Sequence, residues 1–147
     1  MGVKVGKFRV KADTDITEEE IKGSGLLLLG SPAENRLLER MQAELPVKWM
    51  KGGVEVDEIY YPRSGFTLVC PNPLAPRKLL GIISLPFSPS GNEVFLRQLR
   101  FTLCAYGLRG EDSASVTTPD LMVVDDTGRI RHIASYDADW ENLIPVQ

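Results

Sequence analysis

The hydrophobic positions of the chain fall into runs of two kinds, which predict two kinds of strand. Continuous or nearly continuous apolar runs are typical of strands buried on both faces, and they occur at 26–29, 66–70, 79–84 and 121–124. Alternating apolar and polar residues instead indicate strands with one solvated face. Such alternation occurs at 8–12, at 130–134 and at 47–56, where Lys51-Gly52-Gly53 interrupts it and predicts a hairpin.

Apolar residues spaced by three or four positions predict two longer helices. The apolar stripe of the first helix comprises Leu37, Leu38, Met41 and Leu45, and Pro46 ends this helix. Asn92 is a suitable cap for the second, whose stripe comprises Phe95, Leu96, Leu99, Leu103 and Tyr106. A shorter helix is expected from Thr17 to Lys22, because Thr17 and Glu20 have the spacing of a capping box.

The segment from Leu26 to Asn35 links a strand to a helix by a tight turn. Ser31 is a preferred N-cap residue, Pro32 suits the first position of a helix, and Glu34 has the capping-box spacing. We therefore expect the helix to start directly after Ser31. A strand, a tight turn and a helix form the first half of a βαβ unit, whose helix N-terminus favours anions.

The order of these elements predicts an α/β fold over residues 1–147 as a single domain. We expect a three-layer sandwich of the flavodoxin or Rossmann kind, with a mixed sheet whose central strands are parallel. The hairpins at 47–56 and 121–134 are expected as antiparallel additions at the sheet edges, the second turning at Asp125-Asp126-Thr127-Gly128. Residues 57–65 are expected to be an excursion between strands.

Composition narrows the class of protein. The net charge of −3 argues against a nucleic-acid partner, because such a partner requires a basic face. The apolar runs are much shorter than the ~20 residues of a membrane span, and the N-terminus lacks the apolar core of a signal peptide. Cys70 and Cys104 are expected as free thiols of a cytoplasmic protein, with a single disulfide as the alternative.

Polar residues at the ends of the predicted strands form the candidate ligand site. In open α/β sheets ligands bind beyond the carboxyl ends of the strands. If three turns meet there, Ser31, Asn35, Asn72 and Ser84 line one crevice beside Cys70. Capping by Ser31 and burial of Cys70 are the simpler interpretations of these two residues.

No catalytic constellation is evident in the sequence. A dyad of Cys70 with His132, the single histidine, requires a geometry that the predicted edge position of His132 disfavours. There is no nucleophile elbow, P-loop or dinucleotide fingerprint, and Asp125-Asp126 is typical of a turn. We therefore predict no catalytic residues, no metal and no cofactor. Trp49, Tyr60 and Tyr61 either pack at a sheet edge or form an exposed patch for a partner or a sugar.

Five segments together resemble a known domain. The segments are 13–17, 26–35, 45–47, 69–74 (Val-Cys-Pro-Asn-Pro-Leu) and 120–140. They are similar to a domain appended to bacterial α/β-hydrolase-type esterases and prolyl-oligopeptidase-like proteins. The resemblance implies an accessory module, because in such proteins the catalytic serine belongs to the neighbouring hydrolase domain.

Three functional hypotheses follow, in decreasing order of support. The first is a non-catalytic module that binds another protein, either a hydrolase domain or a second copy of the chain. The second is a binder of small anions or other small ligands at the Gly30–Asn35 turn. The third is a hydrolase with an unrecognised site. The sequence leaves the ligand, the partner and the oligomeric state open.

Overall fold

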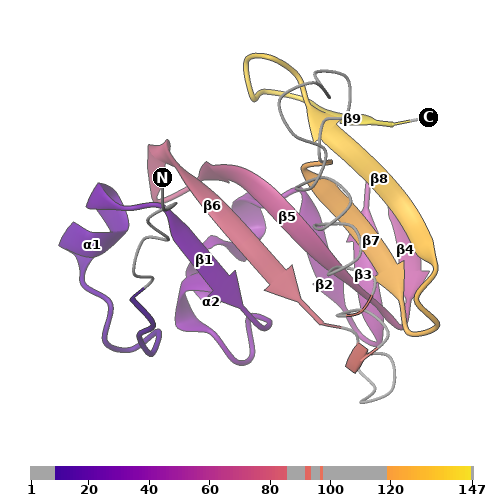
Figure 1. The fold of residues 1–147 in the computed structure, drawn as a ribbon, viewed down its shortest axis with the longest axis horizontal. Coiled ribbons are helices and arrows are strands. Elements are labelled where there is room, and N and C mark those ends of the chain that lie inside the picture. The colour runs from indigo at the N-terminus through magenta and orange to yellow at the C-terminus, as the bar shows by residue number, and fades with distance from the viewer. Residues whose placement is uncertain (1–8, 86–91, 94–96, 98–118, 147) are drawn as a thin grey trace, which may run out of the picture.

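The chain folds into two β-sheets that pack face to face with short helices between and beside them (Figure 1). The structure is a computed structural model and describes residues 9–85, 92–93, 97 and 119–146. The larger sheet has the strand order β1-β6-β5-β7-β8-β9, and the smaller sheet has the order β2-β3-β4. Within the described residues the strands are β1 (Leu26–Leu29), β2 (Val47–Met50), β3 (Gly53–Val56), β4 (Ile59–Pro62), β5 (Ser64–Asn72), β6 (Ala75–Ser84), β7 (Leu121–Asp125), β8 (Ile130–Tyr136) and β9 (Leu143–Pro145).

The predicted three-layer α/β sandwich is wrong. Among the described strands only β1 and β6 pair in parallel, whereas β5 pairs antiparallel with both β6 and β7, and β8 and β9 continue the antiparallel arrangement. The single parallel pair lies at one edge of the larger sheet rather than at its centre. The chain is therefore a predominantly β protein, in which short helices cover part of one sheet face.

The leucine run of β1 is the clearest reason for that error. Leu28 is buried in the interior, where 6% of it is exposed, and Leu26 on the same face packs partly against the core, while Leu27 and Leu29 remain 58% and 62% exposed on the opposite face. β1 is thus an edge strand with one buried side chain, although its sequence is as apolar as that of a central strand. The run in β7 behaves as predicted, because Leu121, Met122, Val123 and Val124 are all buried.

The smaller sheet contains the predicted hairpin, but in a different place. β2 and β3 pair antiparallel around Lys51 and Gly52, which confirms the hairpin. Instead of joining the edge of the larger sheet, the hairpin pairs with β4, which arises from the segment that was expected to be an excursion. Arg63 adopts a positive φ of 47° between β4 and β5, where the chain passes from one sheet to the other.

The helices confirm the predicted stripe at residues 37–45 and change one boundary. α1 (Glu18–Gly23) has the predicted capping box of Thr17 and Glu20. α2 (Arg36–Met41) continues into the 3₁₀ helix η1 (Gln42–Glu44), and its apolar stripe is buried as expected. However, α2 starts at Arg36 rather than after Ser31, because Asn35 is its N-cap.

Two other predictions fall at the limits of the described residues. The strand expected at 8–12 is not formed over residues 9–12, which are exposed and irregular. Of the helix expected after residue 92, Asn92, Glu93 and Arg97 are helical, and its remaining residues up to Tyr106 lie outside the described part. No helix in the part of the chain that the structure describes is long and apolar enough to cross a membrane.

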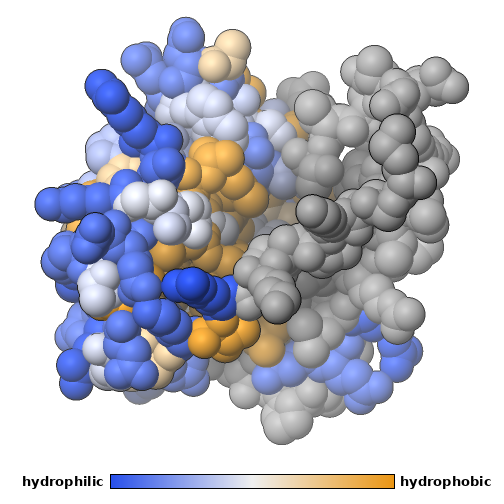
Figure 2. Space-filling model, turned by 60° about the vertical axis from the view of Figure 1, so that its left-hand side comes forward, coloured by the Kyte–Doolittle hydropathy of each residue, from blue (hydrophilic) through white to orange (hydrophobic). Residues whose placement is uncertain are grey.

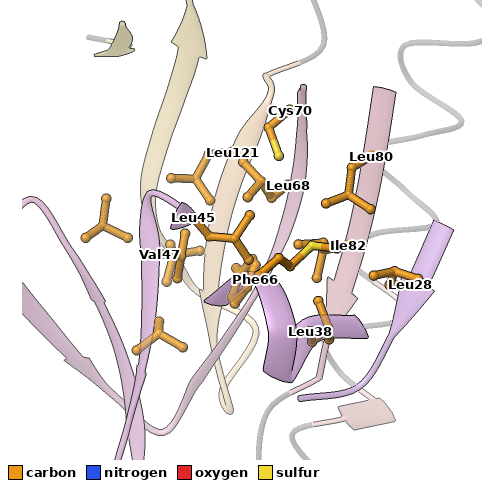
Figure 3. Packing of buried hydrophobic residues seen from close by; sticks show 14 of the residues in the cluster. Leu28, Leu38, Leu45, Val47, Phe66, Leu68, Cys70, Leu80, Ile82 and Leu121 are labelled. Carbon is orange, nitrogen blue, oxygen red and sulfur yellow. The ribbon is translucent and has the colours of Figure 1, made fainter. Parts of the chain in front are cut away.

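The hydrophobic core lies between the two sheets and α2 (Figure 3). Phe66 of β5 is fully buried at its centre, and its ring lies 5.2 Å from that of Trp49 of β2, at a tilt of 55°. Side chains from both sheets and both helices complete this core, among them Ile21, Leu38, Met41, Val47, Val54, Leu68, Leu80, Ile82 and Leu121.

Candidate functional site

The strand register separates the four residues of the predicted ligand site into two groups. Leu29 pairs with Ile83, so the Gly30–Asn35 turn follows β1 at the same end of the sheet as Ser84. Ser84 pairs with Phe66, whereas Asn72 is six residues further along β5, which corresponds to ~20 Å of extended chain. Ser31 and Asn35 therefore share an end with Ser84, and Asn72 lies at the opposite end of the sheet.

The N-terminus of α2 has its hydrogen-bond donors already satisfied by the protein. Asn35 Oδ1 accepts from the N–H groups of Leu37 and Leu38, at 2.9 and 3.3 Å. The Asn35 carbonyl accepts from Glu39, and Asp13 Oδ2 accepts from the N–H of Arg36 at 2.7 Å. The Asp13 carboxylate thus occupies the place that an external anion would take at this six-residue helix.

Ser31 is a turn residue instead of a helix cap. Its carbonyl accepts from the N–H groups of Glu34 and Asn35, at 3.0 and 2.9 Å, and these bonds close the turn before α2. Gly30 has a φ of 105°, and a Cβ atom at this position would lie 2.8 Å from Glu34 Oε2. The turn therefore needs glycine at position 30, and its polar groups serve the connection between β1 and α2.

Ser84 and Asn72 are both buried and both have structural partners. Ser84 Oγ lies 3.0 Å from Trp49 Nε1, which donates to it across the core. Asn72 Oδ1 accepts from the N–H of Leu74 at 2.9 Å and so stabilises the turn into β6. Asn72 Nδ2 is buried without a hydrogen-bond partner in the described part of the chain.

Cys70 and His132 do not form a dyad. The level of His132 along the sheet is that of Phe66, because Val123 pairs with both, and Cys70 is four residues further along β5, or ~13 Å. Burial raises the pKa of the Cys70 thiol to about 12, so the thiol stays protonated at neutral pH. His132 instead lies beside Tyr61, with ring centroids 5.9 Å apart and the rings tilted by 40°.

The acidic pair at 125–126 forms a turn, as its sequence predicts. Asp125 Oδ1 accepts from the N–H and hydroxyl of Thr127 and from the N–H of Arg129. Burial acts to raise the pKa of Asp125, but these hydrogen bonds outweigh it and lower the pKa. No cluster of three or more His, Cys, Asp or Glu side chains in the described ranges could hold a metal ion.

The three aromatic residues of the smaller sheet have different environments. Trp49 and Tyr61 contribute to the core, as the edge-packing interpretation expects. Tyr60 is 46% exposed, and its hydroxyl donates to the carbonyl of Lys51 at 2.9 Å. This one exposed ring, anchored to the neighbouring turn, does not form the extended aromatic patch considered from the sequence.

A shallow hollow of about 470 Å³ opens between η1 and the β8–β9 loop. Glu44, Asp57 and Glu141 line it together with Tyr136 and Asn142. The Tyr136 ring packs against Trp140, at a centroid distance of 5.4 Å, and so stiffens one wall. The hollow is open to solvent, and its carboxylates project from an exposed rim, which is ordinary for surface acids.

The feature that the sequence interpretation missed is an apolar patch on the outer face of the larger sheet. We call this surface the leucine patch, and it consists of Leu27, Leu29, Val69 and Leu79. Its side chains are between 39% and 62% exposed. Leu27 and Val69 flank Gly81 in adjacent strands, so the glycine forms the low centre of the patch. Figure 2 shows hydrophobic surface near the middle of this view, with hydrophilic residues along its left-hand side.

The sequence does contain a sign of the leucine patch, but the hydrophobic pattern of its strands has two possible explanations. The runs 26–29 and 79–83 lack any polar residue, which is expected both of doubly buried strands and of strands with an exposed apolar face. The pattern of hydrophobicity alone cannot distinguish these two cases, since the distinction depends on what covers the outer face.

Comparison of the chain with protein-family models, with curated proteins and with solved structures found no match. The resemblance to domains appended to esterases therefore rests on the sequence motifs alone, and it enters the next subsection as a proposal.

Proposed function

We propose that the chain is a non-catalytic module that binds another protein or domain through the leucine patch. The observation that carries this proposal is the exposure of Leu27, Leu29 and Leu79, at 58%, 62% and 50%, on one continuous sheet face. Soluble proteins rarely leave contiguous apolar surface uncovered, and larger patches mark interaction sites.

Burial of the patch would supply part of the free energy of binding to a partner. Complete burial of a leucine side chain contributes ~1.5–3 kcal/mol, so each half-exposed leucine still offers ~1 kcal/mol to a partner. The absence of charged side chains among Leu27, Leu29, Val69, Leu79 and Gly81 means that no ionic group must be desolvated. Such a patch resembles the apolar centre of an interface, where a polar rim surrounds it.

A hydrolase domain is the partner that the sequence motifs suggest. The resemblance to domains appended to α/β-hydrolase-type esterases implies that this chain accompanies a catalytic domain. The buried, protonated Cys70 thiol and the distance of His132 from it support a role without chemistry of its own. In this proposal, the activity resides in the partner.

The contacts favour this function over the small-anion alternative. The first-turn N–H groups of α2 already bond to Asp13 and Asn35, so an anion would have to displace a carboxylate of the protein. Asn72 is at the far end of the sheet and cannot complete a site with Ser31. The proposed ligand residues therefore lack a common crevice.

A photo-cross-linking amino acid at position 79 tests the proposal. Leu79 is replaced by p-benzoylphenylalanine in cells that naturally produce the chain, and the adducts are identified by mass spectrometry. The matched control places the same group at Glu39, which is exposed on α2. We expect one defined protein adduct from position 79, which the Val69→Lys substitution abolishes. Identical adducts from both positions, or none from position 79, would refute the proposal.

A further inference from the structure

We draw no further inference here: the strongest candidate, the outward edge of β1 beside the leucine patch, has no strand partner among the described residues, and nothing in the structure shows what covers it.

Discussion

Trp49 Nε1 donates a hydrogen bond of 3.0 Å to Ser84 Oγ and so links the smaller sheet to the end of β6. Ser84 is 5% exposed, and the Trp49 ring is fixed against Phe66. The bond therefore crosses the interior between two sheets whose strands are far apart in the sequence. It assigns to Ser84 a structural role in place of the ligand contact expected from the sequence.

Replacing Ser84 with alanine should destabilise the fold by about 1–2 kcal/mol, because it leaves the indole N–H without its acceptor. Urea unfolding followed by tryptophan fluorescence measures this loss. Trp49→Phe removes the donor, and adding Ser84→Ala to it should then cost clearly less than in the wild type. Equal costs in both backgrounds would show that the bond contributes nothing.

Replacing Asn35 with alanine should destabilise the protein by about 1 kcal/mol, because Asn35 caps α2 through the N–H groups of Leu37 and Leu38. Ser31→Ala is the matched control and should change the stability by less than about 0.5 kcal/mol, because Ser31 takes part in the turn through its carbonyl. Thermal unfolding of the two variants decides between the observed cap and the one expected from the sequence.

The free energy of unfolding should decrease as the pH rises from about 9 to about 12, because burial raises the pKa of the Cys70 thiol from 9.0 to about 12. In this window the unfolded chain releases the thiol proton and the folded chain retains it, so unfolding becomes easier, by at most about 1.4 kcal/mol per pH unit. Below pH 9 both states keep the proton and this contribution is constant.

Unfolding free energies at pH 8 and pH 10.5, measured in a Cys104→Ser background, test this dependence. Cys70→Ala should make the loss of unfolding free energy between pH 8 and pH 10.5 smaller but should not remove it. The remaining loss comes from Tyr136, because burial raises the pKa of its hydroxyl to about 12. In the same background the single remaining thiol should react with a disulfide reagent at pH 8 only as fast as the protein opens. A thiol that reacts like free cysteine would contradict the burial of Cys70.

Replacing Gly53 with alanine should cost about 2–3 kcal/mol, because the new Cβ atom would lie 2.2 Å from the Tyr61 carbonyl oxygen and 2.9 Å from the Tyr60 ring. Neither the strand backbone nor the ring can move aside freely. Gly23→Ala is the control, since no atom lies within 4 Å of a Cβ at the end of α1, and it should be neutral or slightly stabilising. Chemical denaturation of both variants provides the comparison.

Local structure was predictable from the sequence where a single physical rule decides it. The capping box of Thr17 and Glu20, the hairpin at Lys51-Gly52 and the turn at Asp125 depend on interactions among residues that are close in the chain. The stripe of α2 was also correct, because helical spacing brings Leu37, Leu38 and Met41 to one face regardless of what covers it.

The strand order and the direction of pairing were not predictable in this way. Nothing in the residues of β1 distinguishes an edge strand paired with β6 from a central strand, and the antiparallel insertion of β5 between β6 and β7 depends on the whole chain. The prediction of a ligand crevice was wrong for the same reason. It required the C-terminal ends of β1 and β5 to lie at the same end of the sheet. Asn35 was missed as a cap because Ser31 and Pro32 satisfy the same local rule four residues earlier.

The position of β1 also has a consequence for synthesis of the protein. β1 leaves the ribosome well before β6, its partner among the described strands, which begins only at Ala75. Until then four adjacent leucines have no strand to pair with, and contacts so distant in the chain form slowly. Nascent chains should therefore be prone to aggregate during this interval, and chaperone binding to the exposed leucines should then have its largest effect.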